Sequence, residues 1–143
     1  MIIKNIPCMI IFEDDVYFHP NWKQLFPKLY EETPKNFDFL YLGSSYSLFT
    51  TTKVVEKGPV YQTHAMVLTL FGAKKLVEYV ETRPIKTLDV MLSELGRNEA
   101  GKDKINWYIW DITHLSEEER GEFDPNFNGL VYQQTSFPSN CSG

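Results

Sequence analysis

The apolar residues of this chain fall into short runs, and several of these runs predict strands. Residues 8–12 form an uninterrupted apolar run, a pattern typical of a strand that is buried on both faces, as in parallel sheets. Residues 37–42, FDFLYL, predict a second strand. Further strands are expected at residues 61–70, 105–112 and 129–133. Residues 44–59 are rich in Ser and Thr without a clear period, and this stretch predicts a long loop or a hairpin.

Other apolar residues recur at helical spacing. They predict amphipathic helices over residues 22–30, 72–80 and 88–95, and the pattern after Ser116 resembles a capping box that opens a short helix. Pro27 falls inside the first of these helices, which predicts either a broken helix or one that begins near the proline. Strands and helices together predict an α/β fold.

The length and composition of the chain set the number of domains and exclude several classes of protein. A chain of 143 residues fits one domain, 1–143, with a core of its own. The net charge of −5 argues against an electrostatic nucleic-acid binder, because such a protein needs a dense basic face. No apolar run is long enough to span a membrane. The two cysteines are too few for a disulfide scaffold or a zinc finger, and they do not report the compartment.

Three consecutive acidic residues, Glu13, Asp14 and Asp15, follow the first predicted strand. Ligands of open α/β sheets bind beyond the carboxyl ends of strands. If the strand continues, Glu13 and Asp15 point to the same side and present oxygens to one hard cation such as magnesium or manganese. The alternative interpretation is an acidic turn without a metal, and acid pairs at strand ends also occur in phosphotransfer domains and nucleases.

Five segments, in this order, resemble glycosyltransferase family 25, which includes lipooligosaccharide glycosyltransferases and procollagen galactosyltransferases. The segments are Glu13-Asp14-Asp15 after an apolar strand, FDFLYLG (37–43), THAMVLTLFGAKKL (63–76), PIKTLD (84–89) and VYQ (131–133). The resemblance implies a GT-A-like fold, a Rossmann-like mixed sheet with flanking helices. It also implies transfer of a hexose, galactose or glucose, from a UDP-sugar to a hydroxyl of a glycan or hydroxylated protein.

The resemblance also assigns roles. In GT-A enzymes the acidic motif holds a divalent metal, usually Mn²⁺ or else Mg²⁺, and the metal holds the donor diphosphate. Asp15 is the first metal ligand expected and Glu13 the second, through the metal or the donor ribose. Asp14 is expected at the donor. His64 matches a family histidine and is expected to contact the diphosphate or the metal. Its alternative role is that of a hydrogen-bonded structural residue in a strand.

Two more residues have candidate roles from the same resemblance. An inverting transferase needs a base that takes the proton of the acceptor hydroxyl, and Asp89 matches the family aspartate after the proline segment. Its alternative role is that of a carboxylate in the first turn of a helix. Gln133 lies in the VxQ segment and is expected to contact the donor or to end a strand. Aromatic residues of the long loop, Tyr46, Phe49 and Tyr61, are candidates for a sugar-facing rim.

In the family, more chain precedes the acidic strand, so the resemblance implies a GT-A domain truncated at its N-terminus. We therefore expect the strand at residues 8–12 to expose an edge, and a homodimer or a partner chain to complete the sheet. One alternative function is a non-catalytic homologue that binds sugar or metal or serves as an assembly module; another is a generic α/β phosphotransfer domain. The resemblance favours a cytoplasmic protein over one of the endoplasmic reticulum lumen without deciding between them.

Overall fold

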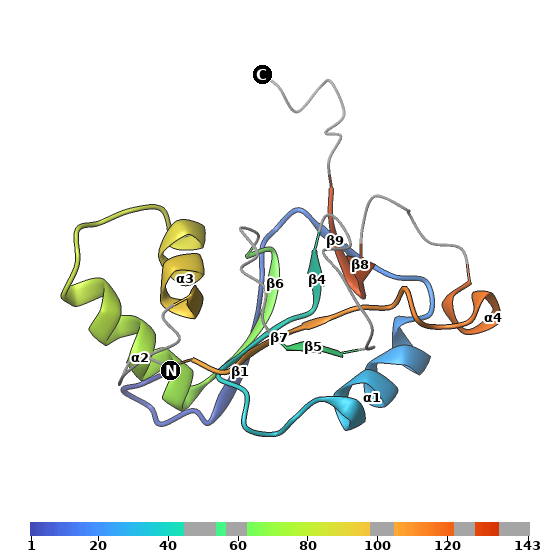
Figure 1. The fold of residues 1–143 in the computed structure, drawn as a ribbon, viewed down its shortest axis with the longest axis horizontal. Helices are drawn as coiled ribbons and strands as arrows, with labels where there is room; N and C mark the ends of the chain where they lie inside the picture. Colours follow the sequence, from blue (N-terminus) through green and yellow to red (C-terminus); the bar gives the residue numbers. More distant parts are fainter. Residues whose placement is uncertain (45–53, 57–62, 98–104, 122–127, 135–143) are drawn as a thin grey trace, which may run out of the picture.

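The computed structural model describes residues 1–44, 54–56, 63–97, 105–121 and 128–134. The main sheet has the strand order β1-β6-β3-β7-β5, and two strand pairs, β2-β9 and β4-β8, lie beside it (Figure 1). The strands are β1 (Cys8–Phe12), β2 (Val16–Phe18), β3 (Phe39–Tyr41), β4 (Gly43–Ser44), β5 (Val54–Glu56), β6 (Ala65–Thr69), β7 (Trp107–Trp110), β8 (Asn128–Gly129) and β9 (Val131–Gln133). The helices are α1 (Trp22–Glu32), α2 (Leu70–Glu81), α3 (Leu88–Arg97) and α4 (Glu117–Arg120).

The sheet is mixed, which confirms the predicted α/β class. Strands β3 and β7 run parallel, whereas β1 and β3 are both antiparallel to β6, and β5 is antiparallel to β7. Strand β5 lies in the segment predicted as a loop or hairpin, and it pairs with a strand more than 50 residues away. Such a distant pairing leaves no short-range signal in the sequence.

Strand β1 has the predicted bounds, but the prediction of a strand buried in a parallel sheet was wrong. It occupies an edge of the described sheet and pairs antiparallel with β6. Ile10, Ile11 and Phe12 remain 45%, 39% and 43% exposed. An apolar run indicates which side chains prefer burial, but the neighbouring elements decide whether that burial is achieved.

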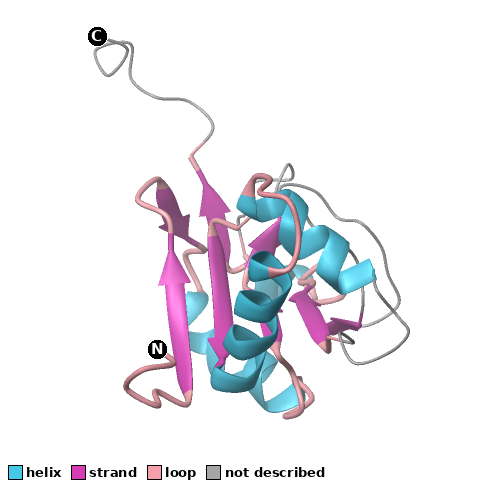
Figure 2. Ribbon diagram, turned by 90° about the vertical axis from the view of Figure 1, so that its left-hand side faces the viewer, coloured by secondary structure: helices cyan, strands magenta, loops and turns pink. Residues whose placement is uncertain are grey.

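Two apolar clusters cover the two faces of the sheet. Figure 1 shows α2 and α3 on one side of the sheet and α1 and α4 on the other, and Figure 2 shows the strands and helices from a second direction. One cluster joins β3, β6 and β7 to α2 and α3, with Tyr79 and Leu95 among its buried residues. The other joins the opposite face to α1 and β9, with Leu29, Trp110 and Val131 among its members.

Helix α1 runs through Pro27 without a break, so the expected break or late start at the proline was wrong. Proline lacks the N–H that would bond to the carbonyl oxygen of Lys23. Both residues are exposed, so water can satisfy that carbonyl. The buried residues Leu25 and Leu29 anchor the helix on both sides of the proline. None of the helices in the described ranges is long and apolar enough to cross a membrane.

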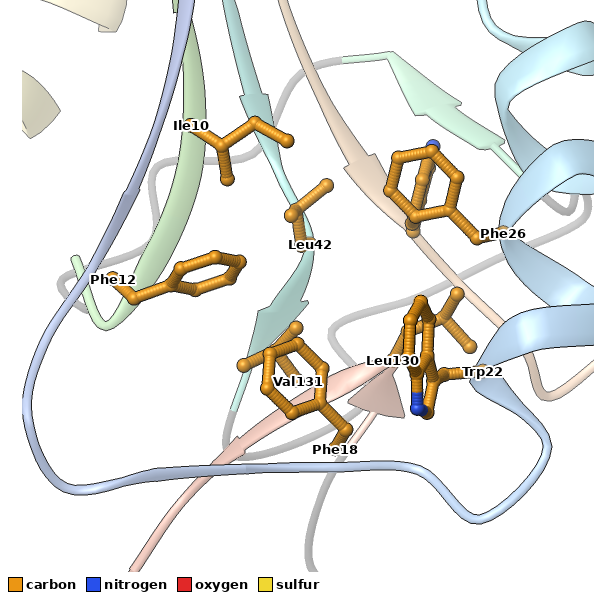
Figure 3. Close-up of a pocket in the computed structure, with 9 residues that line it drawn as sticks. Ile10, Phe12, Phe18, Trp22, Phe26, Leu42, Leu130 and Val131 are labelled. Atoms are coloured by element: carbon orange, nitrogen blue, oxygen red, sulfur yellow. The ribbon is translucent and has the colours of Figure 1, made fainter.

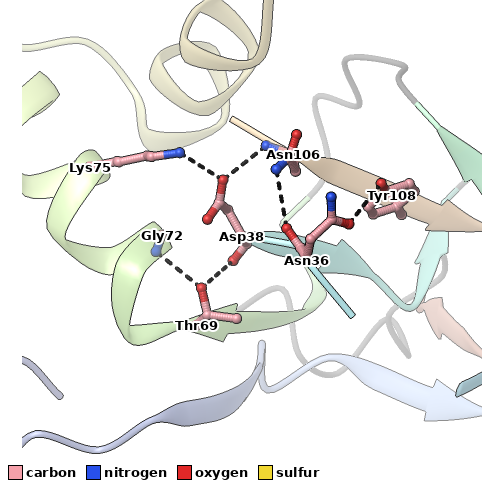
Figure 4. Close-up of polar contacts among 7 residues, drawn as sticks. All are labelled: Asn36, Asp38, Thr69, Gly72, Lys75, Asn106 and Tyr108. Carbon is pink, nitrogen blue, oxygen red and sulfur yellow. Dashed lines mark hydrogen bonds and ion pairs between the residues drawn. The ribbon is translucent and has the colours of Figure 1, made fainter. Parts of the chain in front are cut away.

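A buried carboxylate, Asp38, fixes the junction of β3, β6, β7 and α2 (Figure 4). Its Oδ2 accepts hydrogen bonds from Lys75 Nζ and from the backbone N–H of Asn106, each at 2.9 Å. Its carbonyl oxygen accepts from the backbone N–H of Thr69 at 3.0 Å, and the Thr69 hydroxyl caps α2 by accepting from the Gly72 N–H at 3.0 Å. Asp38 is only 3% exposed, so this network holds the sheet and α2 in register.

Candidate functional site

The acidic turn, residues 13–15, lies between β1 and β2. The Glu13 backbone N–H donates to the His64 carbonyl oxygen at 2.9 Å, which continues the β1–β6 pairing by one residue. The Glu13 carboxylate accepts a hydrogen bond from the Thr63 hydroxyl at 2.8 Å. Glu13 and Asp14 are exposed and Asp15 is half-buried. The turn therefore offers solvent-facing carboxylates beside the start of β6.

Asp15 is held at two points by the end of β9. Gln133 Nε2 donates to Asp15 Oδ2 at 3.2 Å, and the Gln134 backbone N–H donates to the Asp15 carbonyl oxygen at 2.7 Å. The second carboxylate oxygen, Oδ1, is buried and has no hydrogen-bond partner among the described residues. A buried carboxylate oxygen without a donor costs free energy unless a ligand or water satisfies it.

His64 lies beside this turn and is 1% exposed. Its Nε2 is 2.9 Å from the Val131 carbonyl oxygen. Because that oxygen only accepts, Nε2 carries the proton, and in the neutral ring Nδ1 carries the lone pair. Nδ1 is buried without a hydrogen-bond partner in the described part of the chain. Burial lowers the pKa of His64, and the Val131 bond and the charges of Glu13 and Asp15 oppose this effect.

The close approach of β4 to β9 depends on Gly43. A Cβ atom at this position would lie 1.8 Å from the Val131 carbonyl oxygen and 3.2 Å from His64 Nε2. Both Gly43 and that oxygen belong to the site, and sequence reasoning missed them along with Thr63. The signals available were the glycine that ends FDFLYLG and the threonine that precedes His64. A backbone carbonyl leaves no signal of its own.

The residues present fit a divalent cation that takes few ligands from the protein. Asp15 Oδ1 and the Glu13 carboxylate are hard oxygen donors of the kind that Mg²⁺ and Mn²⁺ prefer. Among the residues that the structure describes, no three His, Cys, Asp or Glu side chains are placed to hold a metal ion together. Mg²⁺ is usually held by one or two carboxylates together with substrate phosphates and water, so two protein ligands are consistent with such a site.

Asp89 has its hydrogen bond within its own helix and not with the acidic turn. It stands in the first turn of α3, where its Oδ1 accepts from the Val90 backbone N–H at 2.9 Å. Helix α3 packs against α2, as Figure 1 shows. In the described structure, Asp89 makes no hydrogen bond or ion pair with residues 13–15. The structure thus brings together four of the predicted residues, Glu13, Asp15, His64 and Gln133. The role of Asp89 as a base stays a prediction.

An apolar pocket of about 280 Å³ lies next to the acidic turn (Figure 3). Phe12 and Phe18, which flank the turn in sequence, both line it. The other lining residues are Ile10, Trp22, Phe26, Leu42, Trp110, Leu130 and Val131. The predicted sugar-facing residues, Tyr46, Phe49 and Tyr61, lie outside the described residues.

Residues 1–92 match the family model described as glycosyltransferase family 25 (LPS biosynthesis protein). A search of the curated proteins finds no match. The matched span contains the acidic turn, His64 and Asp89, whereas Gln133 lies beyond it. The order of motifs, the mixed α/β fold and this match over more than half of the chain agree with one another. The chain belongs to glycosyltransferase family 25.

Proposed function

We propose that this protein is a metal-dependent glycosyltransferase that transfers a hexose, galactose or glucose, from a UDP-sugar to a hydroxyl of a glycan or hydroxylated protein, with inversion. Family membership supports glycosyl transfer as the reaction class. The observation that supports a cation site is the buried Oδ1 of Asp15 in an acidic turn, which has no hydrogen-bond partner among the residues that the structure describes. We take residues 1–143 as one GT-A-like domain.

In this proposal Asp15 and Glu13 hold Mn²⁺ or Mg²⁺. The cation, when bound, stabilises the negative charge that develops on the leaving diphosphate. Gln133 orients Asp15 by donating to Oδ2, which leaves Oδ1 for the cation. The Thr63 hydroxyl orients Glu13 in the same way through Oε1. Asp14 is exposed in the same turn and is proposed to contact the donor.

Asp89 is proposed to accept the proton of the attacking hydroxyl. Its Oδ1 accepts from the Val90 N–H, and the carboxylate is only half-buried, so water and an acceptor hydroxyl can reach it. The carboxylate lies in the first turn of α3.

The test is calorimetric titration of the protein with UDP in the presence and absence of Mn²⁺. We expect UDP binding that depends on Mn²⁺. Asp15→Asn is expected to weaken it by at least about 100-fold, since even outer-shell substitutions at metal sites cost about 10–100-fold. The substitution keeps the size of the side chain and removes the charge that holds the cation.

Glu31→Gln is the matched control, because it removes one exposed carboxylate from α1, far in sequence from the acidic turn. It is expected to leave the UDP affinity unchanged. Absence of Mn²⁺-dependent UDP binding by the folded protein, or equal affinity in Asp15→Asn and Glu31→Gln, contradicts the proposed cation site.

A second candidate function is that of an assembly module, and the position of β1 at an edge of the described sheet favours it. Natural edge strands are usually protected by charges, prolines or bulges. Strand β1, CMIIF, contains no charged residue, and its Ile10, Ile11 and Phe12 side chains are exposed. Two copies that pair through β1 around a two-fold axis would extend the sheet across the interface.

This second candidate predicts a dimer at micromolar concentration in light scattering, and a monomer for Ile11→Lys. A lysine at the edge leaves an unpaired charge in the interface and opposes strand pairing. Ile85→Lys is the control, because Ile85 is 91% exposed and lies outside β1. A monomeric mass for the unchanged protein would rule out pairing of two copies through this edge.

A further inference from the structure

We propose that His64 is a positioning residue that acts on Asp15 through β9: by holding the Val131 carbonyl, it keeps the Gln133 amide on Asp15 Oδ2. The inference concerns the same site as the proposed function and rests on that function for its ligand. It assigns His64 a task that needs Nε2, whereas a contact with a metal or a diphosphate would need Nδ1.

The first step is the attachment of β9 at Val131. The Val131 carbonyl oxygen accepts from His64 Nε2 at 2.9 Å, and its N–H donates to the Leu42 carbonyl oxygen at 3.2 Å. Val131 also pairs with Phe18 of β2. His64 immediately precedes β6. Its imidazole therefore links the main sheet to the β2–β9 pair, and the Val131 carbonyl is one point of attachment beside the backbone bonds to Leu42.

The second step leads from Val131 to the acidic turn. Gln133 is two residues further along β9, so its side chain projects from the same side of the strand as that of Val131. It pairs with Val16, the residue that follows Asp15. Gln133 Nε2 and the Gln134 N–H donate to the side chain and the backbone of Asp15, respectively. The position of β9 therefore sets the position of both donors.

The third step concerns the Asp15 carboxylate itself. While Gln133 occupies Oδ2, the buried Oδ1 is the oxygen without a partner among the described residues. If β9 shifts, the Gln133 amide leaves, and the carboxylate is free to rotate. A ligand then has to fix a mobile carboxylate, and ordering a side chain on binding weakens the affinity.

Two amide substitutions separate the two nitrogens of the ring. In His64→Gln the amide nitrogen reaches the position of Nε2 and keeps a donor for Val131, but nothing replaces Nδ1. In His64→Asn the amide nitrogen lies near the position of Nδ1 and does not reach Val131. His114→Asn is the matched control, because His114 is exposed.

The first readout needs no ligand. In ¹⁵N-correlated NMR spectra of the apo protein, we expect the Gln133 side-chain amide and the Gln134 backbone amide to keep their chemical shifts in His64→Gln and His114→Asn. In His64→Asn we expect the Gln133 side-chain signals to move to the values of a solvated amide. Unmoved Gln133 signals in a folded His64→Asn variant would overturn the inference.

The second readout is the Mn²⁺-dependent UDP affinity. We expect His64→Asn to weaken it by about 10–100-fold, the range for outer-shell residues, and His64→Gln to stay within about threefold of the unchanged protein. A larger loss in His64→Gln than in His64→Asn shows that Nδ1 contacts the ligand and overturns the positioning role. An equal loss in both variants shows that a donor at the Nε2 position does not preserve the affinity, and it overturns the role as well. If the unchanged protein binds no Mn²⁺–UDP, the proposed function fails, and the NMR comparison still decides whether His64 positions Gln133.

Discussion

Replacing Asp38 by alanine is expected to lower the free energy of unfolding by about 3 kcal/mol, because it breaks a buried ion pair from one side. The Asp38 and Lys75 side chains are only 5% and 17% exposed. The substitution leaves the Lys75 ammonium without its carboxylate and removes the acceptor of the Asn106 N–H. Urea denaturation followed by circular dichroism measures the loss, provided that the m-value stays constant.

An exposed ion pair provides the comparison. Lys28 Nζ contacts Glu119 Oε1 at 2.8 Å, and the two side chains are 36% and 42% exposed. Glu119→Gln is expected to cost less than about 1 kcal/mol, since solvent screens the pair and replaces its contacts. If Asp38→Ala costs no more than Glu119→Gln, the Asp38 network does not hold the sheet and α2 together.

Asp38 also shows what the sequence reveals about this fold and what it does not. FDFLYLG predicted a strand from its apolar residues, and this pattern indicated no role for the polar Asp38 within it. Its partners, Lys75 and Asn106, are 37 and 68 residues away in the sequence. Local periodicity does not report such distant pairings. The elements were therefore predictable, whereas the contacts that stabilise their arrangement were not.

The main errors have the same origin. The bounds of β1 were predicted from its apolar run, and its place at an edge was expected from the resemblance, but its antiparallel pairing with β6 and the exposure of its side chains were not. Pro27 was expected to interrupt α1, yet the burial of Leu25 and Leu29 outweighs one missing hydrogen bond at an exposed carbonyl. Tertiary contacts decided both the pairing of β1 and the continuity of α1 through Pro27. Such contacts leave no signal in the local sequence.

The candidate site was predictable to a different extent. The acidic turn was evident from the local sequence alone, because three adjacent carboxylates at the end of a strand repel one another unless a ligand binds them. The gathering of Glu13, Asp15, His64 and Gln133 was expected only through the resemblance in motif order, since Asp15 and Gln133 are 118 residues apart. Two parts of the site, the Val131 carbonyl and the absent side chain of Gly43, are backbone features that no side-chain pattern indicates.

Gly43→Ala is expected to have the second large effect, a loss of about 3 kcal/mol or more, at the upper end for overpacking. The new Cβ would lie 1.8 Å from the Val131 carbonyl oxygen and 2.9 Å from the Val131 carbonyl carbon. Both atoms belong to the backbone, so no rotamer change relieves the clash. Strand β9 has to move away from β4, and the bond between His64 and Val131 has to lengthen or break.

Because the clash involves backbone atoms, a smaller side chain at Val131 is not expected to restore the stability lost in Gly43→Ala. Adding Val131→Ala to Gly43→Ala is not expected to restore stability, because the truncation removes side-chain atoms and leaves the clashing carbonyl in place. Urea denaturation of both variants and of Val131→Ala alone measures this, and the double variant is expected to be the least stable of the three. Rescue by Val131→Ala would show that side-chain crowding, and not the approach of two backbones, makes glycine necessary. The His64 attachment would then tolerate a displaced β9, and the route from His64 through Val131 to Asp15 would lose its structural basis.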